Sequence, residues 1–376
     1  MVINSKQRVH AALEGKPVDR NPVTVLYNML YHLDHFAELT GLPQWQALKW
    51  RYAEPDEHLA IYRRMTAAAP FELLQPDEGI SRAERRQVEF IALDGIPYLR
   101  FKSDGSLTPV LTESGHATDY AANQTRFVYT KADIHTQVRV IPAERQLASG
   151  VNEARDAIVT ALGRDHFILT GGVVGTLYSC GAYVGQLNAL EMLKSEPDFI
   201  DALCQRILEQ NIETIRTLAA AGGDAIYIDD ATATSDMISV ADYERFSLPY
   251  MKAMVEEIHR LGHKAIIIYF GGVMDRLDQI ASIGADGLSV ETSMKAYVND
   301  IVEIARRIGQ RVTLFGNLDP IGVLQDGTDA ELEAEMDRQA EAGRSARGFI
   351  MCTGSPITPA TPLQRVQRFI ELGKRI

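Results

Sequence analysis

Two stretches of the same form, AAGGDAIYIDD (residues 220–230) and ASIGADGLSVE (residues 281–291), decide the fold of this chain. Each runs from the end of an expected helix, through glycine and aspartate, into a short apolar strand that ends in an acid. This order is that of the turn between a helix and the next strand in a repeating β/α chain. Strands that are apolar throughout and separated by helices are typical of a parallel sheet. The two stretches therefore predict an α/β fold.

The same alternation of short apolar runs and longer amphipathic stretches continues along the chain, after an expected opening helix at 5–14. Eight strands of this kind favour a closed (β/α)8 TIM barrel over the alternative, a doubly wound open sheet. We expect strands at residues 22–27, 70–76, 166–172, 224–230, 264–270, 286–291, 311–317 and 348–353.

One segment, residues 87–130, breaks this alternation. It contains period-2 runs around Asp-Gly pairs, and Asp-Gly between such runs is a hairpin signal. We interpret it as a small antiparallel β-hairpin insertion in a single domain that spans residues 1–376.

The composition argues against several classes of binding partner. The net charge is −12, and an acidic surface repels nucleic acid and anionic lipid, so we expect no nucleic acid partner. No apolar run approaches the roughly 20 residues of a membrane span, and the charged first residues do not resemble a signal peptide. Three widely spaced cysteines argue against a disulfide framework. These features predict a cytoplasmic protein.

The acids at the strand ends are the main catalytic candidates, because a barrel carries its chemistry at the C-terminal ends of its strands. Asp229 and Asp230 end one strand and Glu291 ends another. Neighbouring buried carboxyls raise each other's pKa, which can keep one of them protonated as a general acid. The alternative is structural, since an acid after a strand often caps the next helix or fixes a loop.

Other side chains at or near the strand ends are candidates for substrate binding. His32 and His35 could share a helix face and hold a metal, but no third ligand is evident, and two histidines of an amphipathic helix explain the pair equally well. Asp319 precedes a proline and could shape a turn, and a cysteine in an apolar strand is usually a packing residue. The candidate substrate-binding residues are Tyr27, His32, Tyr178, Tyr269, Phe270, Asn317, Asp319 and Cys352.

Several phrases together resemble the uroporphyrinogen decarboxylase superfamily over most of residues 6–372. The resemblance is weakest at 40–160. It implies a single (β/α)8 barrel with one of two activities. One branch decarboxylates uroporphyrinogen without a cofactor, and the other moves methyl groups between a corrinoid and a thiol that zinc activates. The phrases are RVHAALEGKPVDRNPV (8–23), DDATATSDMISVADYERFSLPYMKAMVEEIH (229–259), IASIGADGLSVE (280–291), LFGNLDP (314–320) and GSPITPATPLQRV (354–366).

The details of the resemblance favour the methyltransferase branch without its metal. The decarboxylases carry an arginine-bearing segment after the first strand, and this chain has no arginine from Asn21 to Trp50. The methyltransferases carry His-x-Cys-Gly at the end of the fifth strand and a later cysteine. These three ligand positions match Ile268, Phe270 and Ser355. Isoleucine and phenylalanine cannot bind zinc and a serine hydroxyl is a poor ligand, so zinc is not expected.

We therefore expect a zinc-independent methyltransferase-like enzyme that acts on a small substrate or a methyl carrier, with no tightly bound cofactor. A corrinoid protein is an expected partner, and the family often forms homodimers. One alternative is a cofactor-free decarboxylase or lyase of a small carboxylic acid. Another is a non-catalytic barrel that binds a ligand or a corrinoid protein.

Overall fold

The computed structural model describes residues 3–77, 79–94, 96–110, 126–293 and 296–376. Its centre is a curled parallel sheet in which the order of the strands follows the order of the chain, as a repeating β/α unit produces. Its seven strands are β1 (Leu73–Leu74), β5 (Phe167–Val174), β6 (Ala225–Asp230), β7 (Lys264–Tyr269), β8 (Gly287–Val290), β9 (Thr313–Phe315) and β10 (Phe349–Ile350).

The segment 22–25 forms hydrogen bonds to both edges of this sheet. Thr24 N–H donates to the carbonyl of Met351 at 3.0 Å, beside β10, and Glu72 N–H donates to the carbonyl of Val23 at 3.1 Å, beside β1. Residues 22–27 were predicted to be a full strand, but the structure assigns them a single bridge between Val23 and Met351. Pro22 has no N–H to donate, which shortens the ladder.

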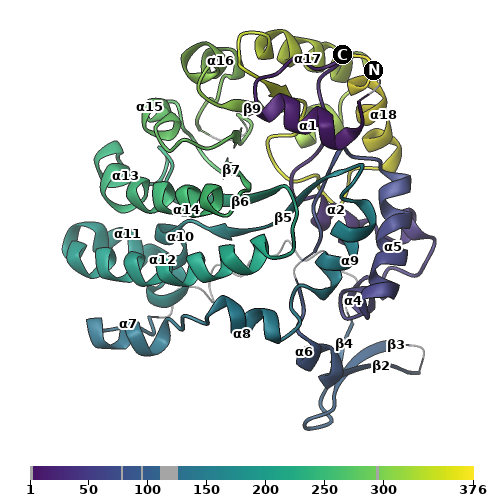
Figure 1. Cartoon of the computed structure of the whole chain (residues 1–376), viewed down its shortest axis with the longest axis vertical. Coiled ribbons are helices and arrows are strands. Elements are labelled where there is room, and N and C mark those ends of the chain that lie inside the picture. The colour runs from purple at the N-terminus through teal and green to yellow at the C-terminus, as the bar shows by residue number, and fades with distance from the viewer. Residues whose placement is uncertain (1–2, 78, 95, 111–125, 294–295) are drawn as a thin grey trace.

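Helices surround the sheet (Figure 1). Two predicted capping patterns are present, since Ser239 accepts from the N–H of Asp242 and Thr328 forms a capping box with Glu331. The helices are α1 (Ser5–Leu13), α2 (Asn28–Asp34), α3 (Phe36–Thr40), α4 (Gln46–Arg51), α5 (Pro55–Ala68), α6 (Arg82–Gln87), α7 (Lys131–Gln137), α8 (Ala143–Ala148), α9 (Glu153–Leu162), α10 (Thr176–Val184), α11 (Gln186–Ser195), α12 (Pro197–Ala219), α13 (Val240–Phe246), α14 (Leu248–Arg260), α15 (Leu277–Ala281), α16 (Ile301–Ile308), the π-helix η2 (Pro320–Gln325), α17 (Asp329–Gly343) and α18 (Leu363–Gly373). Among the described residues, no helix has the length and apolar character needed to cross a bilayer.

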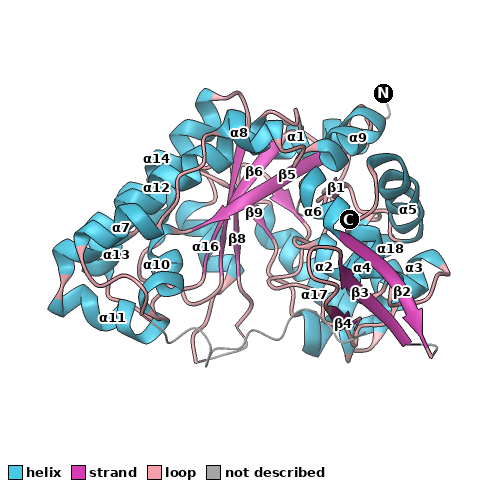
Figure 2. Ribbon diagram, turned by 90° about the horizontal axis from the view of Figure 1, so that it is seen from below, coloured by secondary structure: helices cyan, strands magenta, loops and turns pink. Residues whose placement is uncertain are grey.

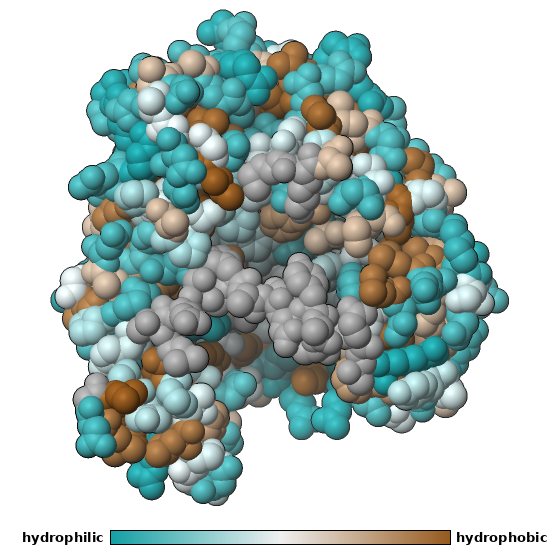
Figure 3. Space-filling view, turned by 180° about the vertical axis from the view of Figure 1, so that it is seen from behind, coloured by the Kyte–Doolittle hydropathy of each residue, from teal (hydrophilic) through white to brown (hydrophobic). Residues whose placement is uncertain are grey.

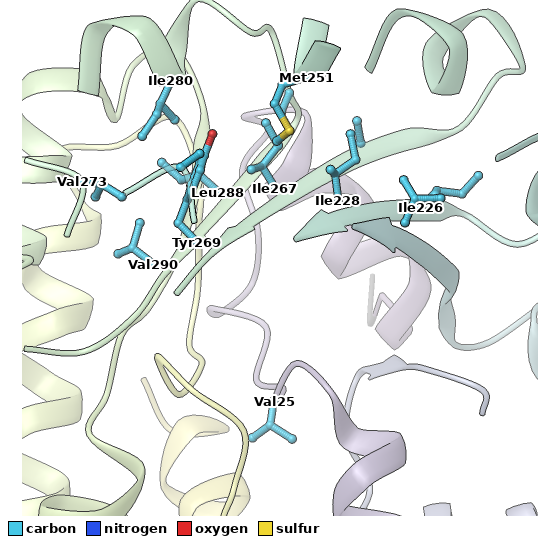
Figure 4. Packing of buried hydrophobic residues seen from close by; sticks show 14 of the residues in the cluster. Val25, Ile226, Ile228, Met251, Ile267, Tyr269, Val273, Ile280, Leu288 and Val290 are labelled. Carbon is cyan, nitrogen blue, oxygen red and sulfur yellow. The ribbon is translucent and has the colours of Figure 1, made fainter. Parts of the chain in front are cut away.

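The alternation of side chains along each strand divides the core into two layers. Ile226 and Ile228 of β6 face the helices, where they join a large apolar cluster (Figure 4). Tyr227 lies on the opposite, enclosed side of the sheet, in a second cluster with Ile268 and Cys352. The direction in which a strand residue points therefore decides whether it can reach the enclosed side.

Helix α1 covers the end of the sheet at which the strands begin. Val9 and Leu13 belong to the enclosed cluster, and the carbonyl of Ala12 accepts a 2.8 Å hydrogen bond from the hydroxyl of Thr313, the first residue of β9. This end is therefore filled by apolar side chains, and the opposite end holds the C-termini of the strands.

A separate antiparallel sheet lies apart from the parallel one (Figure 2). It consists of β2 (Val88–Leu93), β3 (Ile96–Phe101) and β4 (Leu107–Pro109). Val88 and Leu99 anchor this sheet in a small apolar cluster. The cluster also contains side chains of α4 and of the residues next to that helix. The predicted antiparallel insertion is present in this part of the segment 87–130, and residues 111–125 lie outside the described residues.

Candidate functional site

Four side chains meet at the C-terminal ends of the strands, on the side away from α1. Tyr227 and Asp229 come from β6, Phe270 directly follows β7, and Tyr27 directly precedes α2. The ring of Tyr27 lies 5.5 Å from that of Tyr227 and 5.6 Å from that of Phe270, measured between centroids. Tyr227, Asp229 and Phe270 keep partial exposure, whereas the enclosed layer beneath them, which includes Leu169, is buried. We call these four residues the aromatic floor.

The aromatic floor faces the side of the molecule opposite to α1. Figure 1 views the molecule from the side on which α1 lies, and Figure 3 shows the opposite face, which is hollowed near its centre.

The carboxyl of Asp229 is the polar group of this floor. It accepts a short hydrogen bond from the hydroxyl of Tyr27. Burial raises the pKa of Asp229 to about 6; the hydrogen bond from Tyr27 opposes this rise and the charge of Asp230 adds to it. Burial and the nearby carboxylate also raise the pKa of Tyr27, so the phenol keeps its proton. The pair can therefore hold or release one proton near neutral pH.

The backbone of Tyr27 is held in an unusual conformation that aims its side chain at Asp229. Its φ of 58° lies in the left-handed region, which a bulky residue rarely adopts. The side chain of Gln75 accepts from the Tyr27 N–H at 2.8 Å, and the side chain of Asn28 bridges the carbonyl of Leu73 (2.9 Å) and the N–H of Gln75 (3.0 Å). Sequence reasoning missed Gln75, because its only signal is a polar residue at the end of a weak strand.

Two predicted site residues lie on the helix side of the sheet. Asp230 is fully buried, and one of its oxygens accepts from the N–H groups of Thr232 and Ala233, both at 2.8 Å. The hydroxyl of Tyr269 is 2.8 Å from that of Tyr243 in the apolar layer beneath the helices (Figure 4). These contacts give Asp230 the geometry of a turn cap and Tyr269 that of a core residue.

Glu291 follows β8 and belongs to a second polar group. Its carboxylate accepts from the hydroxyl of Tyr297 and lies 3.5 Å from the Ser355 hydroxyl. Asn299 donates to the carbonyl of Glu291 at 2.9 Å, and Asn317 in turn donates to the carbonyl of Asn299 at 2.8 Å. Asn317 thus supports the backbone of this loop through Asn299. Tyr297 and Asn299 come from a loop without a sequence pattern, which is why they were missed.

Asp319, Cys352 and His32 make contacts within the fold. Asp319 accepts from the N–H groups of Ile321 and Gly322 at the start of η2. Cys352 is buried in the enclosed cluster, and burial raises the pKa of its thiol to about 12, which makes it unreactive at neutral pH.

His32 is fully buried, its ring meets the edge of the Tyr62 ring with centroids 5.4 Å apart, and burial lowers its pKa to about 3. Its neighbour His35 instead pairs with Glu38 at 3.0 Å. Among the residues that the structure describes, no group of three or more histidine, cysteine, aspartate or glutamate side chains is arranged to hold a metal.

The three positions that match zinc ligands in the resembling methyltransferases lie together. Ile268 and Phe270 line one closely packed spot, which has no room for a water molecule, together with the sequence-distant Ser355 and with Tyr27 and Thr353. The fold therefore brings the three zinc-ligand positions together, but the side chains at these positions are an alkyl group, a phenyl ring and a neutral hydroxyl. These side chains do not fit zinc.

Tyr178 lies on α10 beside this floor and is 37% exposed. It is close enough to raise the pKa of Tyr27 electrostatically. Together with Val174, whose backbone pairs with Asp229, Tyr178 also lines an open recess of about 240 Å³ along α10. Of the predicted candidates, four lie at or beside the aromatic floor: Tyr27, Tyr178, Asp229 and Phe270. The others lie elsewhere in the fold.

The family model described as Uroporphyrinogen decarboxylase (URO-D) matches residues 118–376, which is more than half of the chain. The chain belongs to the uroporphyrinogen decarboxylase family.

Curated relatives of this family are similar to the chain over part of their length. Uroporphyrinogen decarboxylase 2, chloroplastic, of Arabidopsis thaliana is 30% identical over 213 residues, which cover 54% of this chain and 52% of the relative. Uroporphyrinogen decarboxylase of Coxiella burnetii is 29% identical over 243 residues, covering 61% and 64%. The similarity spans less than two thirds of the length of either relative.

A solved structure described as a methyltransferase from Methanosarcina mazei has the same fold. It superposes with a TM-score of 0.70 at 19% identity and covers 100% of this chain and 99% of that one. Members of the uroporphyrinogen decarboxylase family thus include proteins named as enzymes, and the fold of this chain is shared with a protein named as a methyltransferase.

Proposed function

We propose that this protein is a zinc-independent methyltransferase-like enzyme of the uroporphyrinogen decarboxylase family, acting on a small substrate or a methyl carrier. The observation that carries the proposal is the Tyr27–Asp229 pair on the aromatic floor, beside the space where the zinc positions hold Ile268, Phe270 and Ser355. The place at which related enzymes activate a thiol with a metal has instead a carboxyl that can take up a proton.

Asp229 would act as the general base of methyl transfer. With its pKa raised to about 6, Asp229 is mostly ionised at pH 7.5 but remains a stronger base than an exposed aspartate. It would accept the proton of an attacking thiol or hydroxyl as that atom forms its bond to the methyl carbon, while the bond between the methyl carbon and its donor breaks and the donor keeps that electron pair. Tyr27 orients the carboxylate, and the rings of Tyr227 and Phe270 limit the access of water.

A corrinoid protein is the proposed methyl carrier or partner, and a homodimer is the proposed assembly. The further proposal that segment 22–25 completes an eight-stranded barrel is supported by its hydrogen bonds to both edges of the sheet. Glu291, with Tyr297 and Ser355, would bind the second reactant.

The experiment that tests this function is methyl transfer to a thiol from a panel of methyl donors, with and without a methylated corrinoid, followed by mass spectrometry. Asp229→Asn should lower the rate by roughly 10²–10⁴-fold, as the loss of a general base does, and Asp337→Asn on the exposed face of α17 should leave it unchanged. Stoichiometric zinc in the purified, active protein would refute zinc independence.

A second candidate is the decarboxylation of a small carboxylic acid, favoured by the name of the curated relatives. In its protonated form Asp229 would then donate a proton to the carbanion that remains after loss of CO₂. Release of CO₂ from small acids, abolished in Asp229→Asn, would favour this candidate over methyl transfer.

A further inference from the structure

The aromatic floor combines ring faces with a carboxyl in one place. Tyr27 and Tyr227 meet edge to face at 71°, and Tyr27 and Phe270 are tilted by 46°. Because each ring packs against its neighbour, the three rings are held in position. The face of an aromatic ring carries partial negative charge, so a fixed set of rings attracts cations.

The two aspartates of β6 add negative charge to the surroundings of this floor. The groups that raise the pKa of Tyr27 and Asp229 are burial, the tyrosines at 178 and 227, and the two aspartates of β6. No lysine or arginine among the described residues is one of these groups. At neutral pH the floor therefore presents a carboxylate that a phenol stabilises, and no basic side chain in the described part of the chain is paired with it.

We propose that the aromatic floor binds a small organic cation of the methylated ammonium class, with Asp229 as its counter-ion and the rings of Tyr27, Tyr227 and Phe270 against its methyl groups. This inference rests on the proposed function only in placing the substrate at the same site. It adds the chemical class of that substrate, which carries its positive charge on the atom that bears the methyl groups.

Other ligand classes fit these residues less well. An inorganic cation needs several oxygen, nitrogen or sulfur ligands, whereas the floor offers a single carboxylate and two phenol oxygens, one of which already donates to that carboxylate. An anion would be repelled by Asp229. A neutral apolar ligand would cover the carboxylate of Asp229 and remove its hydration without supplying a positive charge or a hydrogen bond. A fully methylated ammonium group is weakly hydrated, so its transfer from water to the floor costs little free energy. It also has no N–H that must find an acceptor.

Binding to the full-length protein at pH 7.5 tests this inference, measured by calorimetry or by NMR titration. Choline and its neutral isostere 3,3-dimethyl-1-butanol have the same shape and differ in charge. We expect choline to bind at least tenfold more tightly than the isostere, and tetramethylammonium to compete with it. Asp229→Asn should remove most of this preference, Phe270→Leu should weaken binding of choline about 3- to 10-fold, and Asp337→Asn should change neither.

Equal affinity for choline and the isostere would overturn the inference, as would an unchanged preference in Asp229→Asn that melts no lower than the parent protein. These results are independent of catalysis. If choline binds as expected but no methyl transfer is found, the floor is a cation site and the proposed enzyme activity fails. If methyl transfer depends on Asp229 but choline does not bind, the activity stands and the substrate class is wrong.

Discussion

Replacing Asp229 with asparagine should make the protein more stable, and the gain should depend on pH. A carboxyl whose pKa is higher in the folded than in the unfolded chain contributes its full stability only below the unfolded value. That stability is lost as the pH rises through the folded value. For Asp229 the two values are about 6 and 3.8, so the loss develops between about pH 4 and pH 6.

The size of the effect follows from the shift. One pKa unit corresponds to about 1.4 kcal/mol, so the ionised carboxylate costs about 3 kcal/mol at pH 7.5. Asparagine avoids this cost and still offers a carbonyl oxygen to the hydroxyl of Tyr27. For a chain of this length the gain corresponds to a rise in melting temperature of about 4 °C. At pH 4.2 the expected gain is under about 1 kcal/mol, because the folded carboxyl is then almost fully protonated and the pH is only slightly above the unfolded pKa of 3.8.

The assay is thermal unfolding of the parent protein, Asp229→Asn and the exposed control Asp337→Asn, at pH 7.5 and pH 4.2. The control should show no difference at either pH. A gain of equal size at both pH values would mean that the effect is not electrostatic. A loss of stability at pH 7.5 would mean that the carboxylate has a favourable partner, and the electrostatic account of the floor would be wrong.

Three further predictions concern the neighbours of this carboxyl. Tyr27→Phe removes the hydrogen bond that stabilises the ionised form, so the pKa of Asp229 should rise above about 6 in a carbon-13 NMR titration of labelled aspartate. Gln75→Ala frees the Tyr27 N–H and loosens the position of the Tyr27 hydroxyl, so it should raise the pKa of Asp229 in the same titration. Tyr243→Phe leaves the Tyr269 hydroxyl buried without its partner and should lower the stability by about 1–3 kcal/mol in urea unfolding, while the titration of Asp229 stays unchanged.

The sequence predicted the parallel strands best where the residues themselves determine the structure. Strands β6 and β7 lie within the predicted ranges 224–230 and 264–270, because apolar residues occur on both faces of a buried strand. The range 22–27 was predicted as a strand on its apolar residues alone. Its pairing depends on Met351 and Glu72, which no local pattern in the sequence reveals.

Of the predicted site residues, Tyr27, Tyr178, Asp229 and Phe270 lie at or beside the aromatic floor, but the sequence did not predict their contacts. Asp229 and Asp230 are adjacent in sequence, and the two-residue period of a strand places them on opposite sides of the sheet. Applying that period would have separated them before the structure was known. Gln75 and Tyr297 could not be predicted, because their roles depend on loops that tertiary contacts position.

The two aspartates also differ in how the fold compensates their burial, and this difference argues for the role of Asp229. Burial raises the pKa of both to about 6. Asp230 is closed off from solvent; one of its oxygens caps a turn with two backbone N–H groups, and the other has no hydrogen-bond partner among the described residues. The carboxyl of Asp229 accepts a hydrogen bond from the phenol of Tyr27 and remains partly exposed on a floor of rings. Asparagine would fill the same space at less cost in stability, so a carboxyl at this position is best explained by a proton or a cation that it meets there.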